Sequence, residues 1–285
     1  MLGFTDNRQD ASLQAGHFND FVQILLLRGA LLAAIRNEPG QVLTDDILTQ
    51  RVLDHLHLEP ADYGENPGAK GGAAELTRGA LRDVLGYRLY YDLRRGWRIT
   101  SPNLEQLQLL EIGYRGLVEC CQDEAEWEEA HPLLRSLSPE KRYEIALELL
   151  AVMRRSLCIK TIHLDPFFQE QIRNRSFNRL KEPWGLSEDE RLTPSSYMIP
   201  RPRSAHGTSG IDAVFVSHRS RFGRRFKSRE VWGLDNPYYP ERFDEDTYNE
   251  VIDSLLRVLS VYGIVEATDL PQGYKGYRLE SSLLE

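Results

Sequence analysis

Basic and aromatic side chains alternate in the segment between Arg201 and Arg229. This segment holds eight arginines and lysines and one acid, whereas the whole chain has a net charge of −8. Arginine neutralises phosphates and aromatic rings stack on unpaired bases, so this composition suits a nucleic-acid strand. Three phenylalanines accompany the cations as candidate stacking rings: Phe215, Phe222 and Phe226. The cations predicted to contact phosphates are Arg219, Arg221, Arg224, Arg225 and Lys227.

The same segment has explanations that need no ligand. A charge run is often only a solvated surface, and the acidic stretch Glu119–Glu129 offers carboxylates with which the cations could pair. Prolines, serines and glycines are frequent from Leu192 to Ile211, which is typical of a linker or of an arm over a surface. We therefore predict a basic linker or arm at residues 191–236 that binds DNA. A solvated surface and pairing with the acidic stretch stay open as alternatives.

A second candidate site lies near the C-terminus. Asp244 has the pattern of a helix cap, and Gly263 has the pattern of the helix end. The helix between them would turn a buried apolar side inward, formed by Val251, Ile252, Leu255, Leu256 and Leu259. Two strand-like runs follow, around the turn-rich stretch Leu270–Gly276. A helix, a glycine stop and a hairpin in this order describe the second half of a winged helix.

The hairpin tip would present Gln272, Tyr274 and Lys275. We expect Lys275 to contact a phosphate and Tyr274 to stack on an unpaired base. The alternative is that Tyr274 and Tyr277 pack across the hairpin and that Lys275 only keeps the tip soluble.

The third candidate site is the turn at the N-terminus. Leu2–Thr5 has the pattern of a buried strand, and Asp6 with Gln9 fits a capping box at a helix start. Such a turn presents backbone N–H groups and the positive end of a helix dipole to a phosphate. We expect Asn7 and Arg8 to contact a nucleic-acid phosphate, and ion pairs of Arg8 with neighbouring aspartates are the alternative. Because the strand starts almost at the first residue, we expect the chain to begin inside a domain.

No pattern for catalysis or metal binding is present in the sequence. The glycine-rich stretch Gly68–Gly72 resembles a phosphate loop only superficially and is predicted to be a flexible loop. Cysteines 120, 121 and 158 lack the paired spacing of a zinc site and indicate reduced thiols. Asp10 and His17 lie roughly 10 Å apart along a helix, which is poor for one metal ion. We therefore predict no catalytic residue, no metal and no cofactor in this chain, which alone would lack ATPase activity.

The spacing of apolar residues predicts a mainly α fold with small β-hairpins, an α+β arrangement of helices and winged-helix-like modules. Composition divides the chain into five segments. These are 1–36, a strand, turn and helix; 37–112, a winged-helix-like module; 113–190, a helical domain; 191–236, the basic linker or arm; and 237–285, a C-terminal winged helix. No signal peptide or membrane-spanning run is visible, so we expect a cytoplasmic protein without a membrane partner.

The N-terminal run Gly3-Phe4-Thr5-Asp6-Asn7-Arg8-Gln9-Asp10-Ala11 lies within a wider match over Leu2–Val22. It resembles the start of the second RecA-like domain in superfamily 2 DEAD/DEAH-box helicases of a large bacterial type, some of them found in phage-defence islands. The pieces 91–100, 103–106 and 182–184 are also similar to such proteins. The resemblance implies that residues 1–36 are the leading edge of that domain and that the remainder is an accessory or insertion region. ATP and Mg²⁺ would then bind elsewhere in a parent chain.

These observations predict a nucleic-acid-binding accessory region of an ATP-dependent DNA helicase, not a complete motor. Its partners would be DNA and the remainder of the helicase chain. A free-standing winged-helix regulator that binds DNA is the first alternative. A protein-interaction adaptor is the second, because the acidic helical stretch 119–129 suits a protein partner.

Overall fold

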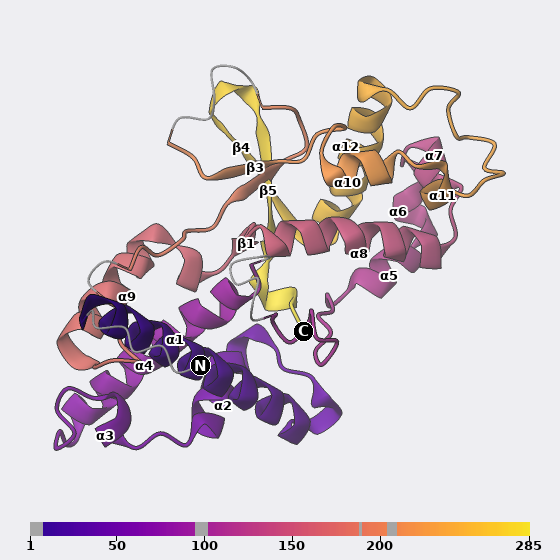
Figure 1. Cartoon of the computed structure of the whole chain (residues 1–285). Coiled ribbons are helices and arrows are strands. Elements are labelled where there is room, and N and C mark those ends of the chain that lie inside the picture. The colour runs from indigo at the N-terminus through magenta and orange to yellow at the C-terminus, as the bar shows by residue number, and fades with distance from the viewer. Residues whose placement is uncertain (1–7, 95–101, 188–189, 204–209) are drawn as a thin grey trace, which may run out of the picture. The chain divides into compact units, whose positions relative to one another are not determined.

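A computed structural model of the protein describes residues 8–94, 102–187, 190–203 and 210–285, without the side chains of residues 8–20, Gln41, Gln272 and Leu283. The described residues form helices and one small five-stranded sheet, joined by turns and loops (Figure 1). The α+β class predicted from the sequence is therefore confirmed. The predicted strand at Leu2–Thr5 and the predicted extended piece at residues 97–100 lie outside the described residues.

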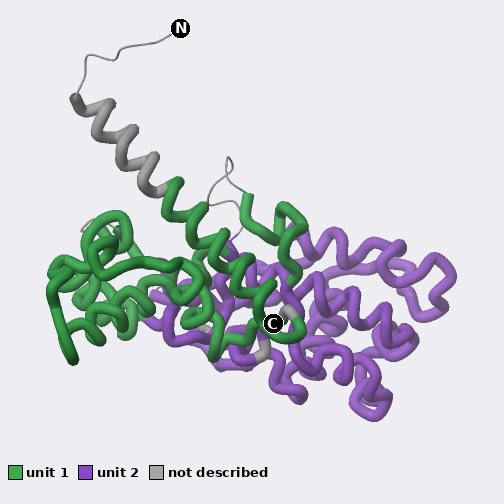
Figure 2. The backbone as a smooth tube through the Cα atoms, turned by 90° about the horizontal axis from the view of Figure 1, so that it is seen from below, with its two compact units in different colours: residues 1–92, 98–111, 166–192 green, residues 93–97, 112–165, 193–285 purple. Residues whose placement is uncertain are grey.

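The chain forms two compact units (Figure 2). Unit 1 contains residues 1–92, 98–111 and 166–192, and unit 2 contains residues 93–97, 112–165 and 193–285. The chain passes from unit 2 to unit 1 after residue 165 and returns after residue 192. The unit boundaries therefore differ from those of the five segments predicted from the sequence; segment 113–190, for example, contributes residues to both units.

Unit 1 is helical in its described part. Its helices are α1 (Arg8–Asn37), α2 (Asp45–Leu56), α3 (Pro60–Tyr63), α4 (Gly72–Asp92) and α9 (Pro166–Arg179), with the short 3₁₀ turn η1 (Pro39–Gln41). Helix α2 packs against α1 and α4, and α4 packs against α9. The buried Arg28 of α1 donates to both carboxylate oxygens of Asp92, at 2.6 and 3.0 Å, and to the Pro102 carbonyl at 2.9 Å. This charge-assisted contact joins α1 to the end of α4.

Unit 2 carries the sheet and the remaining helices. The helices are α5 (Leu117–Gln122), α6 (Glu124–Glu128), α7 (Pro132–Arg135), α8 (Pro139–Arg155), α10 (Arg221–Phe226), α11 (Arg229–Trp232) and α12 (Glu245–Val261). The strands are β1 (Ile159–Lys160), β2 (Tyr197–Ile199), β3 (Ala213–Phe215), β4 (Val265–Asp269) and β5 (Lys275–Glu280). Three 3₁₀ turns complete the unit: η2 (Ile162–Leu164), η3 (Pro271–Gly273) and η4 (Ser281–Leu283).

Strand β5 is the centre of the sheet. It forms the predicted antiparallel hairpin with β4, with Val265 opposite Leu279 and Asp269 opposite Lys275. Its other edge pairs with β1 in parallel and with β2 antiparallel, and β2 pairs with β3 in parallel. The hairpin is thus one part of a larger sheet, and the segment after β2 is held beside its tip.

Helix α12 follows its sequence pattern closely. Asp244 caps it by accepting a hydrogen bond from the Thr247 N–H at 3.1 Å. The predicted inward residues are all buried: Val251, Ile252, Leu255, Leu256 and Leu259. Gly263 follows the helix with a φ of 68°, a left-handed conformation that glycine adopts without the steric cost of a side chain. Helix, glycine stop and hairpin are therefore confirmed as local structure.

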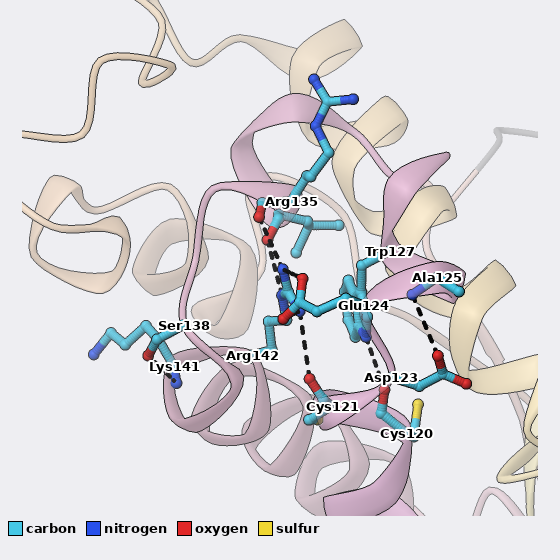
Figure 3. A network of polar contacts seen from close by, with 11 residues as sticks. Cys120, Cys121, Asp123, Glu124, Ala125, Trp127, Arg135, Ser138, Lys141 and Arg142 are labelled. Atoms are coloured by element: carbon cyan, nitrogen blue, oxygen red, sulfur yellow. Dashed lines mark hydrogen bonds and ion pairs between the residues drawn. The ribbon is translucent and has the colours of Figure 1, made fainter.

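A buried arginine ties the helices of unit 2 together (Figure 3). Arg142 of α8 is 1% exposed and forms two hydrogen bonds with the Glu124 carboxylate, at 2.8 and 3.0 Å. It also donates to three backbone carbonyls at or near the ends of α5 and α7, at residues 121, 134 and 135. Its guanidinium carbon lies 4.9 Å from the centre of the Trp127 ring. One side chain thus connects α5, α6, α7 and α8.

We predict that Arg142→Lys destabilises the protein by roughly 3 kcal/mol, because one ammonium cannot reach a carboxylate and three carbonyls at once. The matched control is Arg135→Lys, since the Arg135 side chain is exposed and, among the described residues, donates only to the Glu128 carbonyl, at 3.2 Å. We expect the control to change the free energy of unfolding by less than about 0.5 kcal/mol. Chemical denaturation of both variants measures the difference, and equal stability would contradict the assigned role of Arg142.

Candidate nucleic-acid interface

The basic segment is folded into unit 2. Strand β3 and helices α10 and α11 lie within the segment predicted as a linker or arm, and Phe222, Phe226 and Trp232 are buried. The Phe226 ring lies 5.0 Å from the Trp232 ring and 5.7 Å from the ring of Tyr248 on α12. The expectation of an arm is therefore wrong for residues 213–232. The expectation that Phe222 and Phe226 stack on bases is also wrong, because both rings are in the core.

Helix α10 separates apolar from basic residues. Phe222 and Phe226 are four residues apart and share the buried side, whereas Arg221, Arg224 and Arg225 are exposed. The Ser220 hydroxyl caps the helix by accepting a hydrogen bond from the Gly223 N–H at 2.9 Å. The local sequence therefore displays cations outward because two phenylalanines must be buried.

A close approach of two backbones holds α10 in place. A Cβ atom on Gly223 would lie 2.1 Å from the Ser217 carbonyl oxygen and 2.8 Å from the His218 Cα atom. Only glycine fits between α10 and the chain that leads into it. Gly223 thus positions the three exposed arginines, a role that the basic pattern alone does not indicate.

The predicted phosphate-contacting cations have different surroundings. Arg225 forms an ion pair with Glu148 of α8 at 2.6 Å, and Arg219 donates to the His218 ring at 3.1 Å. Lys227 is half-buried. Arg221 and Arg224 are exposed, and no ion pair involves either of them in the part of the chain that the structure describes. These two arginines are the members of the set whose charge is most available to an external anion.

The acidic stretch has other partners than the basic segment. Glu124 binds Arg142, Glu129 lies 4.0 Å from Arg257, and Asp123 accepts a hydrogen bond from the Tyr262 hydroxyl. This bond raises the pKa of Tyr262 to about 12. Among the described residues, no ion pair joins the acidic stretch to the cations of residues 201–229. The described residues therefore do not support the alternative in which the acidic stretch pairs with the basic segment.

The hairpin tip meets the start of the basic segment. Arg201, Tyr274 and Lys275 line one groove of about 560 Å³ together with residues of α12. The Tyr274 ring packs edge-on against Phe215 of β3, with 5.8 Å between ring centres, and its hydroxyl lies 3.5 Å from the Pro202 carbonyl. The guanidinium of Arg203 lies 5.6 Å from the centre of the Phe215 ring. Two sequence-predicted signals, the basic run and the tip, thus share one surface.

Some residues of the hairpin tip are packed against the unit and others are exposed to solvent. Tyr277 is buried, and burial raises its pKa to about 12, so its hydroxyl is protonated at neutral pH. Lys275 is exposed, and Tyr274 is half-buried. Tyr277 is therefore packed inside the unit, Tyr274 packs in part against Phe215 of β3, and Lys275 is accessible.

Two groove residues were not found from the sequence. Asp253 and Arg257 of α12 line the groove, four residues apart on the side of the helix that faces away from its core. Their spacing follows the helical repeat, but exposed charges at this spacing occur on most amphipathic helices. The structure places them beside the hairpin, because they line the same groove as Tyr274 and Lys275.

Other predicted positions are not tested by side-chain geometry. Asn7 lies outside the described residues. Arg8 is the first residue of α1, and the side chains of Arg8 and of Gln272 at the tip are not described. The three cysteines are free and buried, and burial raises the pKa of Cys158 well above its usual range. No group of three or more His, Cys, Asp or Glu side chains suited to a metal ion occurs among the residues described.

Comparisons with known proteins gave no relative: no family model, no curated protein and no solved structure matches this chain. Within the described ranges, no helix combines the length and apolar character required to cross a membrane.

We predict that Gly223→Ala destabilises the protein by about 1–3 kcal/mol, because the new methyl group overlaps a backbone carbonyl and α10 has to move. Gly79→Ala is the control: Gly79 is also helical, and a Cβ there would meet no heavy atom within 4 Å. The control should be neutral or stabilising by up to ~1 kcal/mol. Thermal unfolding distinguishes the two variants, and an unchanged midpoint for Gly223→Ala would show that α10 is not held by this approach.

Proposed function

We propose that the chain is a nucleic-acid-binding accessory region of an ATP-dependent DNA helicase and not a complete motor. In this proposal unit 2 binds or steers DNA while the parent enzyme moves along it, and the protein acts in the cytoplasm. ATP and Mg²⁺ belong to the parent chain, and the remainder of that chain is the second partner. The helicase part of the proposal rests on the resemblance of residues 2–22.

One observation supports the proposal that the chain binds nucleic acid: the basic segment and the hairpin tip both belong to unit 2. Arg201 and Lys275 line the same groove, and Arg221 and Arg224 extend outward from α10 of the same unit. Cations that extend to solvent attract phosphates over about a Debye length, roughly 8 Å at physiological salt. A chain with a net charge of −8 that still gathers exposed cations in one unit is suited to a local polyanion contact.

We also propose that residues 237–285 act as a winged-helix-like module. The succession of α12, Gly263 and the β4–β5 hairpin supports it. The second edge of β5 pairs with β2 at Tyr277, two residues from Lys275, and this pairing ties the base of the tip into the sheet. Such a tip is suited to meeting a nucleic-acid strand with little loss of conformational entropy.

A free-standing DNA-binding regulator is the second candidate function. It uses the same groove and the same cations of α10, and needs no motor. The two candidates differ in what residues 1–36 do, since only the helicase proposal gives Asn7 and Arg8 a phosphate contact. A regulator would keep its full affinity when both residues are changed to alanine.

We predict that Arg221→Glu with Arg224→Glu weakens DNA binding for all sequences alike and reduces the dependence of affinity on salt. On duplex DNA the slope of log affinity against log salt concentration should fall by roughly 0.9 for each phosphate that the protein no longer neutralises. The control is Arg36→Glu with Arg82→Glu, which changes the net charge equally at two exposed arginines of unit 1. Titrations at several salt concentrations measure the slope. An unchanged slope in the first double variant, or an equal fall in both, would contradict the role of α10.

A further inference from the structure

The groove beside the hairpin tip combines charge, an aromatic ring and a defined volume of about 560 Å³. Its walls come from the hairpin, from the segment after β2 and from α12, all within unit 2. The lining residues with polar or aromatic chemistry include Arg201, Asp253, Arg257, Tyr274, Lys275 and Tyr277. A volume of this size lies in the range of small-molecule sites, roughly 300–1,000 Å³.

Two of the three cations in the groove have little internal compensation. Arg201 is neutralised by Asp253, with which it forms two hydrogen bonds, one of them at 3.1 Å. Arg257 lies 4.0 Å from Glu129, and this distance is the outer limit of an ion pair. The Glu129 side chain is itself 88% exposed, so solvent screens the interaction. Lys275 is exposed and, among the described residues, has no carboxylate at ion-pair distance. The charge available to an incoming anion therefore belongs to Arg257 and Lys275.

The aromatic ring of the groove is fixed by its neighbours. Phe215 supports Tyr274 edge-on, and Arg203 lies over Phe215 from the same basic segment. A ring held in this way loses little freedom when a flat ligand stacks on it. Tyr277, which is buried, also contributes to the wall of the groove.

We infer that this groove binds one nucleotide of a single strand, with its phosphate at Lys275 and Arg257 and its base on Tyr274. The inference rests on the proposed function and names the strand that it handles. A paired duplex keeps its bases stacked inside, so only an unpaired strand offers a base to Tyr274 while its phosphates reach the cations. An acidic peptide would use the two cations but would gain nothing from the aromatic ring.

Asp253 sets the strength of this site. Its carboxylate holds Arg201 in place, and it also repels a phosphate that enters the groove. Replacement by asparagine keeps a hydrogen-bond acceptor for Arg201 and removes the negative charge. The site therefore predicts that Asp253→Asn binds a single strand more tightly, whereas loss of a merely structural ion pair would not strengthen binding.

The experiment uses the full chain and a short single-stranded DNA of mixed sequence, with the matching duplex and polyglutamate as comparison ligands. Tyr274→Ala should weaken single-strand binding about five-fold to one-hundred-fold, the loss expected when one stacked base loses its ring. Tyr274→Phe should retain it. Lys275→Ala should weaken it and lower its salt dependence, and Asp253→Asn should strengthen it several-fold. Each of these changes should be smaller on the duplex.

Three matched controls accompany these variants: Tyr238→Ala for the aromatic ring, Lys70→Ala for the cation and Glu230→Gln for the carboxylate. All three residues are exposed and lie outside the groove. Thermal midpoints show which variants fold normally. If Tyr274→Ala lowers the midpoint, Tyr274→Phe, Lys275→Ala and Asp253→Asn still decide the question.

The outcomes separate this inference from the proposed function. Unchanged single-strand affinity in Lys275→Ala and Asp253→Asn, together with a reduced salt slope in the α10 double variant, would overturn the groove assignment and leave DNA binding by unit 2 intact. Absence of any salt-dependent DNA binding by the unmodified chain would overturn both. Polyglutamate binding equal to that of the single strand, and equally sensitive to Lys275→Ala, would assign the groove to an acidic peptide.

Discussion

A guanidinium buried in unit 2 must be neutralised and fully hydrogen-bonded, and the way Arg142 meets this requirement organises the candidate interface. Its contacts fix α5, α6 and α7 around α8. Helix α8 then supplies Glu148 to Arg225 of α10. The chain leading into α7 is joined to α12 by the hydrogen bond from the His131 N–H to the Ser254 hydroxyl, at 2.9 Å. An uncompensated charge at Arg142 would cost several kcal/mol, so its contacts favour the arrangement in which α5, α6 and α7 surround α8.

Local patterns in the sequence predicted α12 and the hairpin because one short stretch of chain determines each. Asp244, the buried stripe of α12 and Gly263 act within a few residues of one another. The partners of the second edge of β5 could not be predicted, since β1 and β2 are too short to carry a pattern of alternation. Helix α10 was missed for a different reason: the prolines, serines and glycines of residues 192–211 and the basic run that follows suggested an arm, although Phe222 and Phe226 have the spacing of a buried helical side.

The candidate site was predictable in composition but not in arrangement. Lys275, Tyr274 and the cations of α10 were identified from their types, whereas the structure was needed to place Asp253 and Arg257 in the same groove as the hairpin. The structure also shows that residues of the basic segment have different surroundings. Arg201 and Arg225 hold carboxylates of their own unit, Phe222 and Phe226 form core, and Arg221 and Arg224 remain accessible. The acidic stretch is divided in a similar way, since Glu124 neutralises the buried Arg142.

The central claim is that unit 2 contacts a nucleic-acid strand through the groove and through α10. Hydrogen–deuterium exchange of the full chain, with and without a saturating single-stranded DNA, tests this claim without any substitution. We predict slower exchange of backbone amides at residues 197–203, 221–227 and 265–277 when the strand is bound, with α4 and α9 of unit 1 unchanged. Protection confined to unit 1, or protection of the acidic stretch 119–129 in place of these three segments, would contradict the claim.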